Sequence, residues 1–136
     1  MPDRVRAVLD ASAVLRAVVD ESEEAREWIE RIETGSVDGY APDLLHAEVA
    51  NALVNLLRAR FVHREQAGEI LAAVGEIPLS TVSSRDVSLA ACGVAISRDV
   101  TAYDAHYLAL AEVEDAVLLT ADRSMAEAAS ASVLLE

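Results

Sequence analysis

Short apolar runs alternate with helix-forming segments along this chain, and this alternation is what most constrains its fold. The runs that favour strands are residues 5–9, 37–41, 79–82, 116–119 and 133–135. The helical patterns are residues 12–19, 22–34, 42–60, 64–74, 84–97, 101–113 and 122–129, with Pro42 expected to open the third helix. Strands joined by helices favour a parallel sheet with helices on its faces. Because the 136 residues hold no linker or repeat, we expect one α/β domain over residues 1–136, with four to five short strands.

The charged residues exclude several functions. The chain has 24 acidic and 11 basic residues, for a net charge of −13, and every basic residue is an arginine. Without lysine there is no phosphate-loop lysine and no Schiff-base lysine, and a phosphoacceptor receiver domain would lack the lysine it needs. A charge of −13 argues against a general nucleic-acid-binding surface, which needs basic patches. It does not argue against a nuclease, because metal ions can fill an acidic pocket.

The cellular setting follows from what the sequence lacks. Cys92 is the single cysteine, so the chain has neither an intramolecular disulfide nor a cysteine-based zinc site. No apolar run approaches the roughly eighteen residues of a membrane span. The residues after Met1 show no signal-peptide cleavage site. We therefore expect a cytoplasmic protein with no membrane contact.

Four acidic residues lie in otherwise apolar or small surroundings. Asp10 ends the first apolar run, and Asp122 follows the run at 116–119. In parallel sheets, ligands bind beyond the carboxyl ends of the strands, where both of these acids are expected. Each residue alone has a simpler interpretation. Asp10 and Asp122 could cap the helices that follow them, and Asp104 stands at capping-box spacing from Thr101.

Glu48 is the acid that a simple interpretation explains least well. It lies in the middle of a predicted helix, among alanines and valine, with Asn51 three residues later on the same face. Burying an unpaired carboxylate is costly, and Arg58, the nearest arginine in the sequence, is ten positions away. The alternative is that Glu48 lies on an exposed helix surface.

Taken together, the four acids predict a metal site. Two carboxylates about 5 Å apart repel by roughly 3 kcal/mol at an effective dielectric constant near 20. If the four acids converge, they form six such pairs, and the fully ionised cluster would cost on the order of 20 kcal/mol. Such a cluster needs cations, and carboxylate oxygens favour hard ions such as Mg²⁺ or Mn²⁺. The chemistry that suits these ions is phosphodiester hydrolysis by a metal-activated water.

The segments around these acids resemble the PIN domain, and in particular the VapC-type toxins of prokaryotic toxin–antitoxin pairs. The resemblance covers nearly the whole chain, and its motifs are residues 10–13 (DASA), 48–53 (EVANAL), 103–111 (YDAHYLALA) and 120–122 (TAD). It implies a single PIN-like domain and a Mg²⁺- or Mn²⁺-dependent endoribonuclease that cuts single-stranded RNA and leaves 5′-phosphate and 3′-hydroxyl ends. It assigns Asp10, Glu48, Asp104 and Asp122 as catalytic metal ligands, and Ser12, Thr120 and Asn51 as the residues that orient them.

The resemblance also implies partners: a VapB-type antitoxin and a second copy of the chain, with the first helices as candidates for the dimer contact. A basic antitoxin segment would suit so acidic a toxin. Arg123, beside Asp122, is a candidate phosphate contact, although ordinary surface charge explains it equally well. Tyr103 and Tyr107 could stack on bases, but their spacing is more typical of core residues. The main alternative for the whole protein is a PIN fold kept for partner contact without catalysis.

Overall fold

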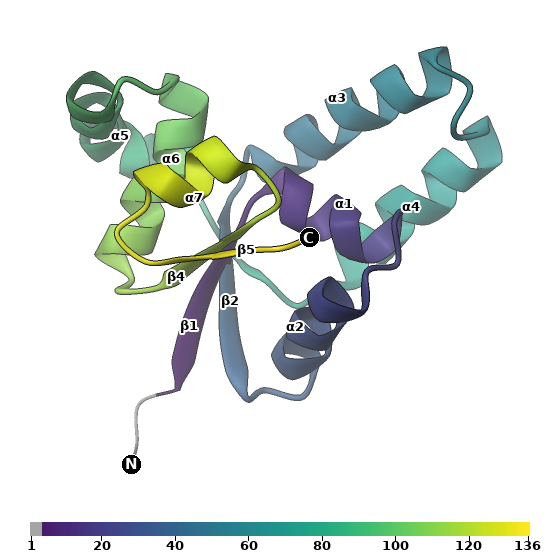
Figure 1. The fold of residues 1–136 in the computed structure, drawn as a ribbon, viewed down its shortest axis with the longest axis horizontal. Helices are drawn as coiled ribbons and strands as arrows, with labels where there is room; N and C mark the ends of the chain where they lie inside the picture. Colours follow the sequence, from purple (N-terminus) through teal and green to yellow (C-terminus); the bar gives the residue numbers. More distant parts are fainter. Residues whose placement is uncertain (1–3) are drawn as a thin grey trace.

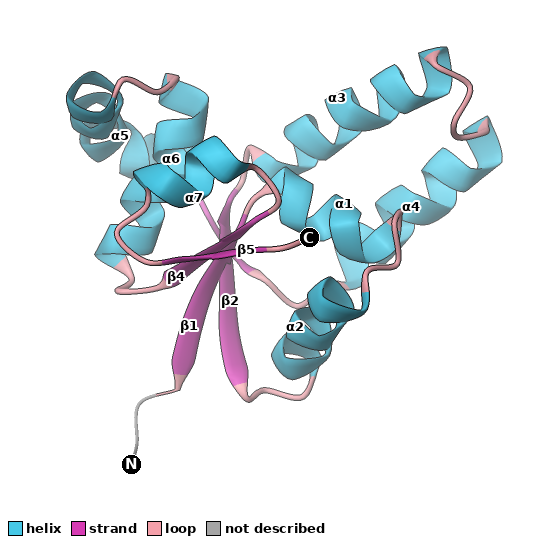
Figure 2. Ribbon diagram, in the orientation of Figure 1, coloured by secondary structure: helices cyan, strands magenta, loops and turns pink. Residues whose placement is uncertain are grey.

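A computed structural model describes residues 4–136, which form a five-stranded sheet with helices on both faces (Figures 1 and 2). Its strands are β1 (Val5–Leu9), β2 (Val37–Pro42), β3 (Ser80–Val82), β4 (Val117–Thr120) and β5 (Ser132–Leu134). Its helices are α1 (Ala11–Val18), α2 (Glu23–Glu33), α3 (Leu45–Arg58), α4 (Arg64–Glu76), α5 (Ser84–Arg98), α6 (Ala102–Val113) and α7 (Arg123–Ala128). The predicted α/β class, with four to five strands, is therefore confirmed.

The strand order is β3-β2-β1-β4-β5, and all neighbouring strands are parallel. The chain moves outward from β1 to β2 and β3, then crosses to β4 on the other side of β1 and continues to β5. The direction of winding therefore changes between β1 and β4. In open parallel sheets, the carboxyl ends of the strands at such a switch point border the crevice where ligands bind.

The core forms around the neighbouring strands β1 and β4. Val8 and Leu9 of β1, and Leu118 and Leu119 of β4, are at most 1% exposed. Both strands are apolar along this stretch because α1 covers one face of the sheet and α6 covers the other. Helix α5 packs outside α6, and α3 and α4 form a helical hairpin that extends away from the sheet (Figure 1).

The predicted start of the third helix is wrong by three residues. Pro42 is the last residue of β2, where it is buried and paired with Val82, and α3 begins at Leu45. Proline cannot donate a backbone hydrogen bond, but the next residue, Asp43, donates to the carbonyl of Val82 instead. The pairing between β2 and β3 therefore continues past the proline.

No helix within residues 4–136 is long and apolar enough to cross a membrane.

Candidate metal site at the carboxyl edge of the sheet

Asp10 lies where β1 ends and is the N-cap of α1. Its carboxylate accepts a hydrogen bond from the backbone N–H of Ala13 at 2.9 Å and one from the Ser12 hydroxyl at 2.6 Å. The hydroxyl of Thr120 donates to its other oxygen at 2.5 Å. Asp10 is only 7% exposed, and burial raises its pKa despite these three donors. Asp10 therefore caps α1 and can also take part in the site, so the two interpretations that the sequence left open are compatible.

Ser12 and Thr120 connect β1 to β4 at this edge. Thr120 is completely buried at the end of β4, and its oxygen accepts from the backbone N–H of Asp122 at 3.0 Å. The oxygen of Ser12 accepts from the backbone N–H of Ala121 at 2.8 Å. Both hydroxyls donate to Asp10, so this network fixes Asp10 relative to the segment that carries Asp122.

Asp122 is the N-cap of α7. One of its carboxylate oxygens accepts from the hydroxyl of Ser124 at 2.7 Å and from the backbone N–H of Ser124 at 2.9 Å. The hydrogen bond from the Ser124 side chain is the main reason that the pKa of Asp122 is lowered. Asp122 is therefore the acid of this group that ionises most readily.

Glu48 faces inward from α3. The core face of this helix consists of Leu45, Val49 and Leu53, and Glu48 lies at its edge, directed toward the end of the sheet. Its Oε1 atom is buried without a hydrogen bond to any described residue, and burial raises the pKa of its carboxyl. The expectation that Glu48 is not an ordinary surface acid agrees with this position.

The hydroxyl of Tyr107 on α6 is the second buried polar atom without a hydrogen bond at this site. It is close enough to Glu48 for each group to affect the pKa of the other, although their geometry falls short of a hydrogen bond. Burial, reinforced by the Glu48 carboxylate, raises the pKa of Tyr107 far above its usual value. The phenol therefore stays protonated and remains a hydrogen-bond donor.

Asp104 comes from the first turn of α6. The N-cap residue Thr101 accepts a hydrogen bond from its backbone N–H at 3.1 Å, as in the capping interpretation, while the carboxylate is half-buried and free to face the site. Burial raises the pKa of Asp104, and the negative charge of Asp122 raises it further.

The four acids line one cavity of about 140 Å³. They come from four separate segments: the ends of β1 and β4, and helices α3 and α6. Its other lining residues are Ala11, Ser12, Tyr107 and Met125. No arginine or histidine lines it among the described residues, so no basic side chain there offsets the repulsion between the carboxylates.

A divalent cation fits this donor set. Across residues 4–136, no three acidic, histidine or cysteine side chains are arranged as a compact cage for an ion. Magnesium does not require such a cage, because it keeps several waters and uses only one or two carboxylates directly. The Oε1 atom of Glu48 is buried without a partner, and Glu48 lines the same cavity as three other acids, an arrangement that a hard cation would satisfy.

The remaining predicted residues lie at the margin of the cavity. Asn51 is exposed on α3 and lines a neighbouring groove, and it makes no hydrogen bond to the four acids in the described chain. Arg123 is exposed beside Asp122, and among the described residues it forms no ion pair.

Sequence reasoning missed Ser124 and the role of the Tyr107 hydroxyl. Ser124 follows Asp122 by two residues, a spacing at which a hydroxyl can bond to a capping carboxylate. Tyr107 follows Asp104 by three residues and so shares its helix face, a signal that could have been used.

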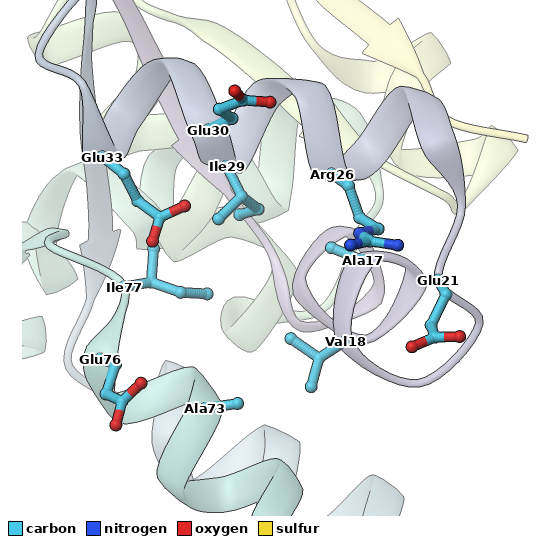
Figure 3. A pocket seen from close by; sticks show the side chains of 10 residues that line it. All are labelled: Ala17, Val18, Glu21, Arg26, Ile29, Glu30, Glu33, Ala73, Glu76 and Ile77. Carbon is cyan, nitrogen blue, oxygen red and sulfur yellow. The ribbon is translucent and has the colours of Figure 1, made fainter.

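A second cavity of about 490 Å³ lies between α1, α2 and the end of α4 (Figure 3). Apolar side chains form its floor, including Val18, Ile29 and Ile77. Acidic side chains surround them, namely Glu21, Glu30, Glu33 and Glu76, with Arg26 as the one basic lining residue. This cavity contains none of the four site acids.

The fold and the site define a class: a small α/β domain with an acidic cavity at the switch point of its parallel sheet. The PIN-domain family model matches residues 7–131. The chain therefore belongs to the PIN-domain family.

Known proteins are similar over most of the chain. This chain is 35% identical to "Ribonuclease VapC3" of Pyrobaculum aerophilum over 125 residues, and the match covers 90% of this chain and 94% of the relative. The crystal structure of PAE2754 from the same organism has a TM-score of 0.73 and 25% identity, covering 96% of this chain and 91% of that chain. A chain of VapBC2 from Rickettsia felis, crystallised with a promoter DNA fragment, has a TM-score of 0.70 and 11% identity, and the match covers 97% of this chain and 100% of that chain.

Proposed function

We propose that this protein is a divalent-cation-dependent endoribonuclease that cuts single-stranded regions of RNA, and that it is the toxin of a VapBC-type pair. The observation that carries the proposal is the convergence of four acids from four segments on one cavity, with Glu48 Oε1 buried and unpartnered. The relative named as a ribonuclease, at 35% identity over nearly the whole chain, supports RNA as the substrate.

Asp10, Glu48, Asp104 and Asp122 would hold Mg²⁺ or Mn²⁺. When bound, such an ion supplies a nucleophilic water at neutral pH and stabilises the charge on the leaving oxygen of a phosphodiester. The chain's own contribution is orientation. Ser12 and Thr120 hold both oxygens of Asp10, and Ser124 holds Asp122 in its charged form.

The composition of the cavity also favours one pair of products. Ribonucleases that use the 2′-hydroxyl most often activate it with histidine, and among the described residues no histidine lines this cavity. Hydrolysis by water therefore fits better and leaves 5′-phosphate and 3′-hydroxyl ends. Asn51 is proposed to help orient Glu48, one helical turn before it, and exposed Arg123 is proposed to contact a phosphate.

An acidic toxin implies a basic partner. The second cavity combines an apolar floor with four glutamates, which suits an amphipathic antitoxin segment rich in arginine or lysine. The similar fold of a chain from VapBC2 supports a VapB-type antitoxin as that partner. We propose that both proteins act in the cytoplasm.

We also propose a homodimer, through α5 instead of the first helices. Helices α1 and α2 pack against each other and the sheet. On α5, by contrast, Leu89 and Ile96 are 89% and 84% exposed, and Cys92 and Gly93 lie between them on the same face. With a net charge of −13, two copies would meet most easily through an uncharged, apolar stripe of this kind.

The direct test is cleavage of single-stranded RNA with Mg²⁺ or Mn²⁺ by the wild type and by Asp10→Asn. Asparagine still accepts the capping hydrogen bond from Ala13, so the variant should fold, and we expect cleavage to fall by at least a hundredfold. Asp115→Asn is the control, because Asp115 is an exposed aspartate outside the cavity with a positive φ that asparagine tolerates. A wild type inactive on varied RNAs with either ion would leave a PIN fold used for partner contact, and an Asp10→Asn as active as the wild type would contradict the proposed role of Asp10.

A further inference from the structure

An open groove of about 450 Å³ adjoins the acid cavity, between α3 and the first turn of α6. The two share Ala11 and Glu48 as lining residues, so a molecule in the groove reaches the acids directly. The volume is within the usual range of small-ligand pockets. Nothing in the proposed metal chemistry requires this groove.

Tyr103 forms one wall of the groove and is 69% exposed. The expectation that Tyr103 and Tyr107 are both core residues is therefore wrong for Tyr103: Tyr107, one turn later on α6, is 1% exposed. Tyr103 is the second residue of α6, where side chains tilt toward the N-terminal end of the helix. Leaving a large aromatic ring in water forgoes the stability that burial would give, and the ring offers a flat face to a ligand.

Asn51 and Asn55 line the groove from α3. Four residues apart, they lie on the same face of the helix, next to the buried stripe of Leu45, Val49 and Leu53. Both are exposed, and neither side chain forms a hydrogen bond within residues 4–136. Each amide offers donors and an acceptor, which is the combination found on the edge of a nucleobase.

The charges around the groove argue against a phosphate site in it. Its one charged lining residue in the described chain is Glu48, at the wall shared with the acid cavity. A phosphate would be repelled there, whereas a neutral base would not. Proteins that hold single-stranded nucleic acid stack bases on aromatic rings and read base edges with polar side chains.

We propose that this groove binds one unpaired nucleobase next to the phosphate that is cut, stacked on Tyr103 and hydrogen-bonded by Asn55 and Asn51. The inference rests on the proposed ribonuclease function and adds a specificity subsite to it. A paired base cannot enter such a groove, because its stacking face and its edge are occupied within the duplex. The subsite would therefore select single-stranded RNA.

The test combines protein variants with RNA lacking one base. A short single-stranded RNA that the wild type cuts at a mapped position is made as a series, each member with an abasic residue at one nucleotide near the cut. Single-turnover cleavage is measured for the wild type, Tyr103→Ala, Tyr103→Phe and Asn55→Ala. The control is Phe61→Ala, because Phe61 is a 79% exposed aromatic in the loop between α3 and α4.

We expect one abasic position beside the cut to slow wild-type cleavage by about 5- to 150-fold, the range for loss of one stacked base. Tyr103→Ala should slow cleavage of the intact RNA by a similar factor and show no further loss at that abasic position, since both changes remove the same contact. Tyr103→Phe keeps the ring and should respond to the abasic series as the wild type does. Asn55→Ala should change the preference for the base at that position, and Phe61→Ala should change nothing.

Two results would overturn the subsite. Tyr103→Ala could cleave every RNA at the wild-type rate, as expected if the groove serves a peptide partner. Alternatively, the abasic nucleotide could slow Tyr103→Ala by the same factor as it slows the wild type. Titration with Mn²⁺ separates this failure from failure of the proposed function, because Tyr103→Ala should bind the ion as the wild type does. If the wild type cuts no RNA, the proposed function has failed. In that case the nucleobase inference is tested alone by fluorescence anisotropy, which compares how the wild type and Tyr103→Ala bind a short single-stranded RNA with and without its bases.

Discussion

Thr120 shows how one buried hydroxyl can organise an acidic site. It donates to Asp10, accepts from the backbone of Asp122 and lies 3.2 Å from the hydroxyl of Ser12. Groups that orient metal ligands in this way commonly change metal affinity or activity 10- to 100-fold when removed. Thr120 is therefore a positioning residue for two of the four acids.

Thr120→Val keeps the shape of the side chain and removes the hydroxyl. We expect cleavage to fall by about 10- to 100-fold, and the metal-free protein to lose about 1 to 3 kcal/mol of stability, because a buried carboxylate loses a donor. Thr120→Ser keeps the hydroxyl and should retain most of the activity. Cleavage kinetics and urea unfolding measure both effects, and equal activity of the two variants would contradict this role.

Glu48 leads to a prediction about pH. Burial raises the pKa of Asp10, Glu48 and Asp104, so the folded protein binds protons more readily than the unfolded chain. The unfavourable contribution of these groups is present at neutral pH and disappears as the pH falls toward the ordinary carboxyl range near 4. The metal-free protein should therefore melt at a higher temperature at mildly acidic pH than at pH 7.

Glu48→Gln separates this local effect from that of the net charge. It should raise the metal-free Tm at pH 7, by about 3 °C for each kcal/mol of repulsion removed, and reduce the gain on acidification. Glu65→Gln on α4 is the control, since Glu65 is exposed and lies outside the cavity. If Glu48→Gln and Glu65→Gln shift the Tm equally at every pH, the repulsion is not local to the cavity.

Residue patterns predicted which acids line one cavity better than they predicted each residue's surroundings. Asp10 and Asp122 could be found because each follows a buried apolar run, and Glu48 because no sequence neighbour could neutralise it. The exposure of Tyr103 could not be read from its spacing. It depends on where α6 begins relative to α3, which is set by contacts distant in the sequence.

At the scale of elements, apolar periodicity predicted every helix and strand of the described chain to within about three residues. The largest error is at Pro42, where a residue that often opens helices instead ends a strand. Local preference allows both positions, and the pairing of β2 with β3 decides between them. The strand order, and with it the switch point between β1 and β4, needed the structure.

Gly39 in β2 reveals a tight contact between elements. A Cβ atom there would lie 2.7 Å from Cδ2 of Leu79 and 3.0 Å from Cδ1 of Ile32 on α2. Gly39→Ala should therefore destabilise the protein by about 1 to 3 kcal/mol, as overpacking does. Gly68→Ala in α4 should stabilise it by about 0.5 to 1 kcal/mol, because space is open there and alanine favours helix. Urea unfolding of both variants tests the packing, and effects of the same sign would contradict it.

At the scale of the whole molecule, the net charge of −13 governs association. We expect the wild type to be a dimer in solution and Leu89→Glu to be a monomer, because it places a charge in the apolar stripe of α5. Glu27→Gln on α2 removes a charge elsewhere on the surface and should leave the dimer intact. Light scattering after size-exclusion chromatography measures the mass, and a dimeric Leu89→Glu would place the contact outside α5.

We propose that Asp10, Glu48, Asp104 and Asp122 form one divalent-cation site. The measurement that tests it most directly is calorimetric titration of the wild type and Asp104→Asn with Mn²⁺ and Mg²⁺, with RNA cleavage followed in the same samples. We expect the wild type to bind the ion and cut RNA, and both properties to collapse together in a folded Asp104→Asn. A wild type that binds no ion, or an Asp104→Asn that binds and cuts as the wild type does, would contradict it.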